Sequence, residues 1–128
     1  MKFLLDTHAF LWWVTDDPAL SGPAREAIAD ESNIVFVSAA TAWEIATKHR
    51  LGKLGGAAGV FERFAELVAA DGFSLMAVET YHALKAGSYA VPHRDPFDRM
   101  LAAQSALEGI QLVTRDPAFE QFGTAVYW

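Results

Sequence analysis

Four acidic residues occupy positions in the chain where carboxylates could do chemistry: Asp6, Glu44, Asp98 and Asp116. Asp6 follows the apolar stretch 2–5, and Asp116 comes shortly after the apolar stretch 111–113. Carboxylates that gather at one point repel one another, so such a cluster is costly unless a cation fills it. Because the oxygen ligands come without cysteine, the pattern favours a hard cation such as Mg²⁺ or Mn²⁺.

Each of these acids also has a purely structural explanation. Asp6 and Asp116 can cap a turn or a helix, and Pro117 after Asp116 strengthens that interpretation. Glu44 can be a solvated glutamate in the middle of a helix, although its apolar surroundings favour the rim of a cleft or a nearby partner. The set of four therefore carries more weight than any single member.

The segment Asp95-Pro96-Phe97-Asp98 contains two acids with different expected roles. With Asp95 as the N-cap of a helix, Pro96 takes the first helical position and Asp98 the third. Capping explains Asp95 but does not require Asp98, which is freer to bind a cation at the open end of the helix. The buried stripe of this helix is predicted at Met100, Ala103, Leu107 and Ile110.

Basic residues flank the acids. Arg94 and Arg99 adjoin the first Asp-Pro pair and Arg115 the second, which suggests phosphate contacts, with ordinary surface charge as the alternative. Lys48 is expected to be routine surface charge. His8 could touch a substrate, although an ordinary helical position is favoured, and the four histidines lack the spacing of metal ligands.

Strand-like and helix-like segments alternate along the chain. Strands are predicted at 2–5, 33–37, 73–77, 111–113 and 124–127. Helices are predicted at 8–14, at 24–30 after a first start signal at Asp17-Pro18, at 39–50 behind the N-cap Ser38, and at 60–70, 79–86 and 96–108. This alternation predicts an α/β fold with a mostly parallel central sheet and helices on both faces. Ligands in such folds bind beyond the carboxyl ends of the strands, where Asp6 and Asp116 are expected.

Composition limits the alternatives. The 128 residues fit a single domain, 1–128, and 52% hydrophobic residues are enough for a packed core. The absence of cysteine excludes disulfides, thiol catalysis and thiolate zinc sites. With no long apolar run, we expect a cytoplasmic protein without a membrane segment or signal peptide. A net charge of −6 argues against a broad basic nucleic-acid surface, but cations in an acidic pocket can reverse the local sign.

Taken together, the motifs resemble the PIN-domain ribonucleases, in particular the VapC-type toxins of type II toxin–antitoxin pairs. The resemblance spans the chain. The matching pieces are Phe3-Leu4-Leu5-Asp6-Thr7-His8, Ser38 with Trp43-Glu44-Ile45, the stretch 93–102, Leu112-Val113-Thr114-Arg115-Asp116 and the final Val126-Tyr127-Trp128. Leu101-Ala102 follow Asp98 at the family's offset, so Asp98 rather than Asp95 is assigned as the family acid, and a supporting role stays open for Asp95.

The resemblance implies a three-layer α/β/α sandwich and an endoribonuclease that depends on Mg²⁺ or Mn²⁺. It implies that Asp6, Glu44, Asp98 and Asp116 are the metal-binding and catalytic residues. Asp6 and Asp98 would be the main direct ligands. It also implies homodimerisation, an RNA substrate and neutralisation by an antitoxin protein encoded beside the toxin.

Three other functions stay open at this point. A catalytically inactive PIN-fold module that binds RNA or protein would have the same fold. A phosphohydrolase with an aspartate nucleophile suits Asp6, but that class usually has a second aspartate where this chain has His8. A receiver domain needs a phospho-accepting aspartate after a central strand, whereas Val78-Glu79-Thr80 follows the third predicted strand.

Overall fold

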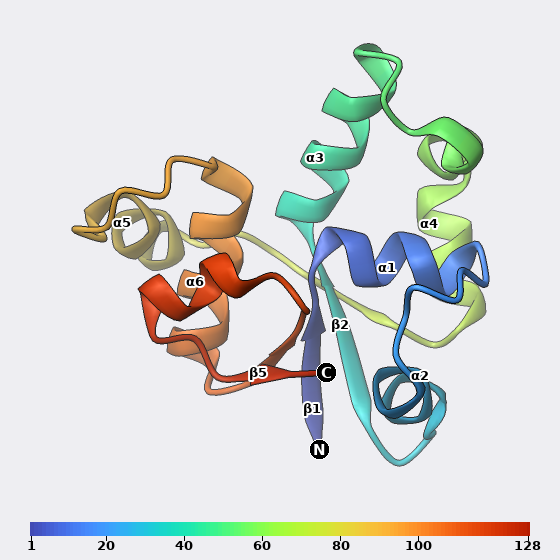
Figure 1. Ribbon diagram of the computed structural model, residues 1–128, viewed down its shortest axis with the longest axis horizontal. Helices are drawn as coiled ribbons and strands as arrows, with labels where there is room; N and C mark the ends of the chain where they lie inside the picture. The colour runs from blue at the N-terminus through green and yellow to red at the C-terminus, as the bar shows by residue number, and fades with distance from the viewer.

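A five-stranded parallel sheet forms the centre of the computed structural model, which describes residues 1–128 (Figure 1). The strand order is β3-β2-β1-β4-β5, and every neighbouring pair is parallel. The strands are β1 (Lys2–Leu5), β2 (Ile34–Ser38), β3 (Ser74–Met76), β4 (Gln111–Val113) and β5 (Val126–Tyr127). The predicted α/β fold with a mostly parallel sheet is therefore confirmed, and the sheet is parallel throughout.

Six α-helices and two short 3₁₀ helices connect the strands. They are α1 (Thr7–Val14), α2 (Gly22–Ala29), α3 (Ala39–Arg50), η1 (Gly55–Ala57), α4 (Val60–Ala70), α5 (Thr80–Ser88), α6 (Pro96–Glu108) and η2 (Pro117–Phe122). The prediction that a helix begins at Asp17-Pro18 is wrong. The Asp17 carboxylate accepts from the Ala19 amide within a turn, and α2 begins only after its N-cap Ser21. None of the helices has the length and apolarity to cross a membrane.

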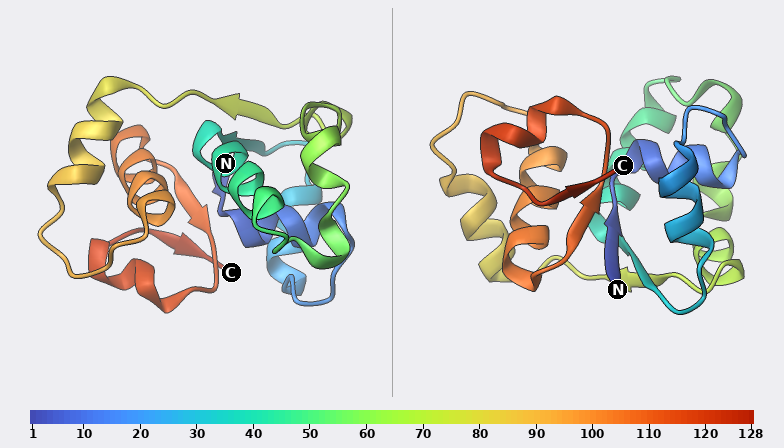
Figure 2. Two further views of the ribbon diagram at one scale, coloured as in Figure 1. Left: turned by 90° about the horizontal axis from the view of Figure 1, so that it is seen from above. Right: turned by 60° about the horizontal axis from the view of Figure 1, so that its bottom comes forward.

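The sheet separates two hydrophobic clusters, which gives the three layers of an α/β/α sandwich. Phe3 and Leu5 of β1 pack with residues of α1 to α4, whereas Leu4 between them packs with residues of α6 and η2. This division follows from the alternation of side chains along a strand. Figures 1 and 2 show α1 to α4 on one side of the sheet and α5 and α6 on the other.

Helix α6 buries a wider face than its sequence pattern predicted. Its buried residues are Leu101, Ala102, Ala103, Gln104 and Ser105, while Leu107 is 44% exposed. The predicted stripe is therefore wrong at Leu107, because α6 packs against α3, α5 and η2 as well as β4. The buried Gln104 amide accepts from the Ser38 hydroxyl at 2.6 Å and donates to the Ala77 carbonyl at 3.2 Å, which ties α6 to the ends of β2 and β3.

Candidate active site

A cavity of about 210 Å³ at the carboxyl ends of the central strands has no hydrophobic residue in its lining. Its lining residues are Asp6, Thr7, His8, Glu44, Lys48, Asp95, Asp98 and Asp116. Asp6 follows β1, Asp116 lies beyond β4, Glu44 comes from α3, and Asp98 from the first turn of α6. The fold thus brings all four sequence-predicted acids into one cavity and adds Asp95.

Asp6 is a helix cap and a cavity carboxylate at once. Its Oδ1 accepts from the Ala9 amide at 2.7 Å at the start of α1, and the residue is 5% exposed. Burial raises the pKa of Asp6 to about 6, against the opposing effect of the Thr114 hydroxyl and the Ala9 amide, and the charges of Glu44 and Asp116 raise it further. The capping explanation holds without excluding a functional role.

Glu44 lies in α3 among groups that favour its charge. The buried Thr7 hydroxyl donates to Oε1 at 2.5 Å, and the Lys48 ammonium lies 3.2 Å from Oε2. Thr41, fully buried, places its hydroxyl 3.4 Å from that of Thr7. Lys48 is therefore not routine surface charge. It pairs with a predicted site residue one helical turn away, on the same face of the helix.

The two acids of the Asp-Pro segment have different contacts, and the predicted capping role of Asp95 is confirmed. Asp95 caps α6, since its Oδ1 accepts from the Phe97 amide at 2.8 Å and the Asp98 amide at 3.2 Å. The Asp98 carboxylate points instead to His93, with 2.8 Å between Oδ2 and Nε2. Burial raises the pKa of Asp98 to about 6, His93 opposes the rise, and Asp95 and Glu44 add repulsion. Sequence reasoning missed His93 as a site residue.

Asp116 caps η2, where its Oδ1 accepts from the Ala118 amide at 2.9 Å. A second cavity of about 310 Å³ begins at Asp6 and Asp116 and is bounded by Trp12 and Arg115. The Arg115 guanidinium carbon lies 4.4 Å from the centre of the Trp12 ring, a cation–π arrangement.

The three arginines predicted to contact phosphate do different things. The Arg99 side chain donates to five backbone carbonyls in the last turn of α5 and in the connection to α6, those of Ala86, Gly87, Tyr89, Val91 and His93. The phosphate prediction is therefore wrong for Arg99, because its donors are used to fix this connection. Arg115 lies over Trp12, and Arg94 is exposed, so a phosphate contact stays a prediction for these two.

The donor types in the carboxylate cavity fit a hard divalent cation, since they are oxygen atoms of clustered and mutually repelling carboxylates. No three histidine, aspartate or glutamate side chains are already arranged so that they could hold a metal ion. The carboxylates instead engage backbone amides, Thr7, Lys48 and His93. Side-chain rotation would therefore have to accompany cation binding.

The family model of the PIN domain matches residues 3–124. A chain of the structure of VapBC2 from Rickettsia felis bound to a DNA fragment from the promoter of these proteins superposes with a TM-score of 0.69 at 14% identity, covering 98% of this chain and 96% of that one. A chain of the structure of FitAB bound to the IR36 DNA fragment gives a TM-score of 0.64 at 21% identity, covering 98% and 93%. No curated protein matches the sequence significantly. At these identities the two structures support the fold, whereas the domain match spans nearly the whole sequence, and the chain therefore belongs to the PIN-domain family.

Proposed function

We propose that this PIN-domain protein is a metal-dependent endoribonuclease and the toxin of a type II toxin–antitoxin pair. The observation that carries the catalytic part is the single polar cavity that contains Asp6, Glu44, Asp98 and Asp116. The match to the PIN-domain family supports nuclease activity, and the resemblance to the PIN-domain ribonucleases implies these four acids as the site. The choice of RNA over DNA rests on the resemblance to VapC-type proteins.

The carboxylates have distinct roles in the proposed reaction. Asp6 and Asp98 would hold a Mg²⁺ or Mn²⁺ ion directly, and Glu44 and Asp116 would complete the site. When bound, such a cation lowers the pKa of water and stabilises negative charge on a phosphate. Glu44, held by Thr7 and Lys48, can orient a water molecule and accept its proton.

The proposed partners are an antitoxin and a second copy of the chain. The two similar structures are those of VapBC2 and FitAB, each bound to a DNA fragment. This similarity supports a protein partner for the chain. A cavity lined by five carboxylates would attract a basic segment of such a partner. Co-expression with the product of the adjacent gene, followed by purification and light scattering, tests both the complex and the dimer. A monomer that recovers no partner contradicts this part of the proposal.

The test of the catalytic part is cleavage of a total RNA pool by purified protein with Mg²⁺ or Mn²⁺. An EDTA sample and Asp98→Asn serve as negative controls. Asp71→Asn is a matched control for the substitution, because Asp71 only accepts from the Trp13 indole at an exposed site outside the cavity. We expect discrete fragments that require both metal and Asp98. A folded protein that binds Mn²⁺ and cuts nothing would instead support a binding module that has kept the site.

A further inference from the structure

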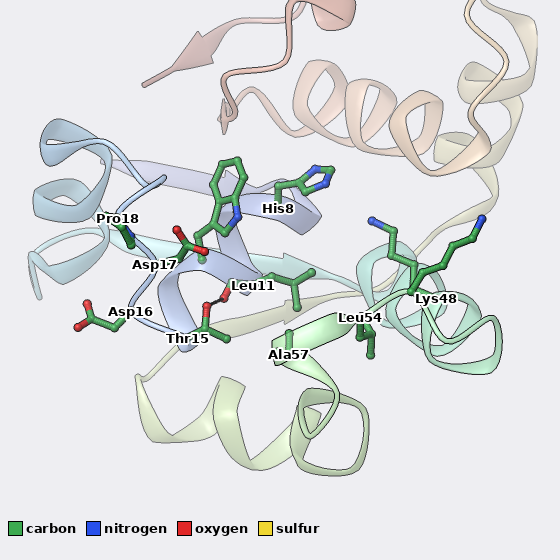
Figure 3. A pocket seen from close by; sticks show the side chains of 12 residues that line it. His8, Leu11, Thr15, Asp16, Asp17, Pro18, Lys48, Leu54 and Ala57 are labelled. Atoms are coloured by element: carbon green, nitrogen blue, oxygen red, sulfur yellow. Dashed lines mark hydrogen bonds between the residues drawn. The ribbon is translucent and has the colours of Figure 1, made fainter.

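A groove of about 470 Å³ opens beside the carboxylate cavity, between α1 and the segment from the end of α3 to η1 (Figure 3). It shares His8 and Lys48 with the carboxylate cavity, so these two side chains border both spaces. A strand whose phosphate lies among the carboxylates would therefore find the groove directly next to it.

The middle of the groove is apolar. Leu11 of α1 faces Leu54 and Ala57 from the opposite segment, and in Figure 3 these three lie between the Lys48 end and the Asp16–Asp17 end. Trp12 also contributes to the lining. An apolar floor beside an aromatic residue suits the flat face of a nucleobase.

The end of the groove nearest the carboxylates is basic. Lys48 and Lys53 line it, and the Lys53 amide donates to the Lys48 carbonyl at 2.8 Å. Because Lys48 pairs with Glu44, Lys53 is the lysine of this end whose charge has no carboxylate partner in the cavity. His8 adds no charge at neutral pH, because burial and the Lys48 charge lower the pKa of His8. The acids at the far end already have partners, since Asp16 pairs with Arg25 at 2.9 Å and Asp17 accepts from the Ala19 amide.

We propose that this groove binds the nucleotide next to the scissile phosphate of a single-stranded RNA. The base rests on Leu11 and Leu54, and its phosphate lies at Lys53, beside the Lys48–Glu44 ion pair. This assignment rests on the proposed nuclease function. It adds a substrate-binding site outside the four acids and names Lys53 as a residue that binds substrate without taking part in the chemistry.

The charges of the groove favour RNA over a segment of a protein partner. A basic protein segment would be drawn to the five carboxylates and repelled by the two lysines beside them. A nucleic-acid strand has the opposite preference, since its phosphates gain from lysines and its bases from apolar and aromatic surface.

The test measures binding separately from cleavage. The probe is a fluorescein-labelled 12-nucleotide RNA of mixed sequence, and its anisotropy is followed in Mg²⁺ with protein that carries Asp98→Asn, so that the strand stays intact. Lys53→Gln is compared with Lys85→Gln, the same change on α5, where Lys85 lies over the Tyr89 ring. Lys53 is exposed, so its substitution should leave the fold unchanged, which circular dichroism verifies.

We expect Lys53→Gln to raise Kd about fivefold and to reduce the salt dependence of log K by about 0.7, the loss of one phosphate contact to a single strand. Lys53→Glu should weaken binding further, and Lys85→Gln should have no effect. In protein with Asp98 intact, Lys53→Gln should raise KM and leave kcat unchanged.

Equal binding by Lys53→Gln and Lys85→Gln overturns the assignment and leaves the groove to a protein partner. Absence of RNA binding in every variant, and also in protein with Asp98 intact, overturns both the groove and the proposed function. Binding that depends on Lys53, together with no cleavage by protein with Asp98 intact, supports the groove and contradicts only the nuclease activity.

Discussion

Two buried carboxylates of the cavity differ in what surrounds them. Glu44 is 8% exposed and has both a hydroxyl donor and the ammonium of Lys48. Asp6 is 5% exposed and has no ion pair, only donors without charge. The α3 side of the cavity therefore carries its own counter-charge at Lys48, whereas Asp6 has none and Asp98 has only the His93 ring, which is charged only when protonated.

This difference indicates which carboxylates need an external cation. Burial disfavours the ionised form of a carboxylate, and it raises the pKa of Asp6 and of Asp98, in the latter case against the opposing effect of His93. A divalent ion would offset this effect of burial, whereas Glu44 already has Lys48. The comparison thus supports the proposal that Asp6 and Asp98 bind the cation directly and that Glu44 handles water.

The largest expected effect is that of Asp6→Asn on cleavage. Asparagine keeps the shape and the oxygen that accepts from Ala9, but it removes the charge that a cation needs. We expect RNA cleavage to fall about a thousandfold, which corresponds to roughly 4 kcal/mol. Single-turnover kinetics at saturating Mg²⁺ measure it. Activity close to that of the unmodified protein would break the assignment of Asp6.

The same substitution should stabilise the metal-free protein at neutral pH. The folded-state pKa of Asp6 is about 6 against 3.8 in the unfolded chain, so stability falls as pH rises through this window, and the cost is complete above pH 6. Asp6→Asn removes that cost and should add up to about 3 kcal/mol at pH 7.5, with no gain below pH 4. Urea denaturation in EDTA at both pH values measures it, and destabilisation at pH 7.5 would contradict the role of burial.

Arg99→Ala should produce the next largest effect. Arg99 donates to five carbonyls, and one of them belongs to His93, whose ring contacts Asp98. The substitution therefore removes the donors of partly buried acceptors and loosens the Asp98 side of the cavity. We expect a loss of about 3 kcal/mol in the free energy of unfolding.

Arg99→Lys is the informative companion, because an ammonium cannot reach five carbonyls that a planar guanidinium spans. It should recover less than half of the lost stability in the same denaturation experiment. If Arg99→Lys recovered all of the lost stability, the positive charge rather than the planar shape of the guanidinium would fix the connection between α5 and α6.

Most of the fold could be predicted from local sequence signals. The bounds of α4 and β4, the N-cap Ser38 of α3 and the N-cap Asp95 of α6 lie where capping residues and apolar runs placed them. The exposure of Leu107 could not be predicted, since it depends on how α6 packs among α3, α5, η2 and β4. The periodicity of apolar residues predicts which face of a helix a side chain lies on, but it does not predict which other elements cover that face.

The candidate site was predicted as a set of acids but not as a set of contacts. Asp6 and Asp116 followed from the rule for parallel sheets, whereas the partners Thr7, Lys48 and His93 required the path of the chain. A clue to Lys48 was visible, because it lies four residues after Glu44 on one helix. Arg99 gave no comparable clue, as its five acceptors are backbone groups whose positions depend on the turn before α6.

Added Mg²⁺ should stabilise the protein more at neutral than at acidic pH. At pH 7.5 Asp6 and Asp98 are ionised and available, whereas at pH 5 protons compete with the cation because both pKa values are about 6. We expect the Tm to rise by about 5 °C in 10 mM Mg²⁺ at pH 7.5, from roughly 1 kcal/mol of linkage, and by less than half of that at pH 5. Equal shifts, or the same shift in Asp6→Asn, would break the comparison between the two sides.

The smallest effect should come from Thr7→Val, which tests the α3 side. Valine keeps the volume and removes the hydroxyl that donates to Glu44, while Lys48 still balances the charge. Because a supporting hydrogen bond positions Glu44 without supplying the reaction's charge, we expect kcat to fall about tenfold with KM and the Mg²⁺-induced rise in Tm unchanged. Thr7→Ser, which retains the hydroxyl, should recover most of kcat. If Thr7→Val instead abolished the Mg²⁺-induced rise in Tm, Glu44 would be a direct ligand. The cation would then bind on the α3 side as well, and the proposed difference between Glu44, balanced by Lys48, and the pair Asp6 and Asp98, balanced by the cation, would be wrong.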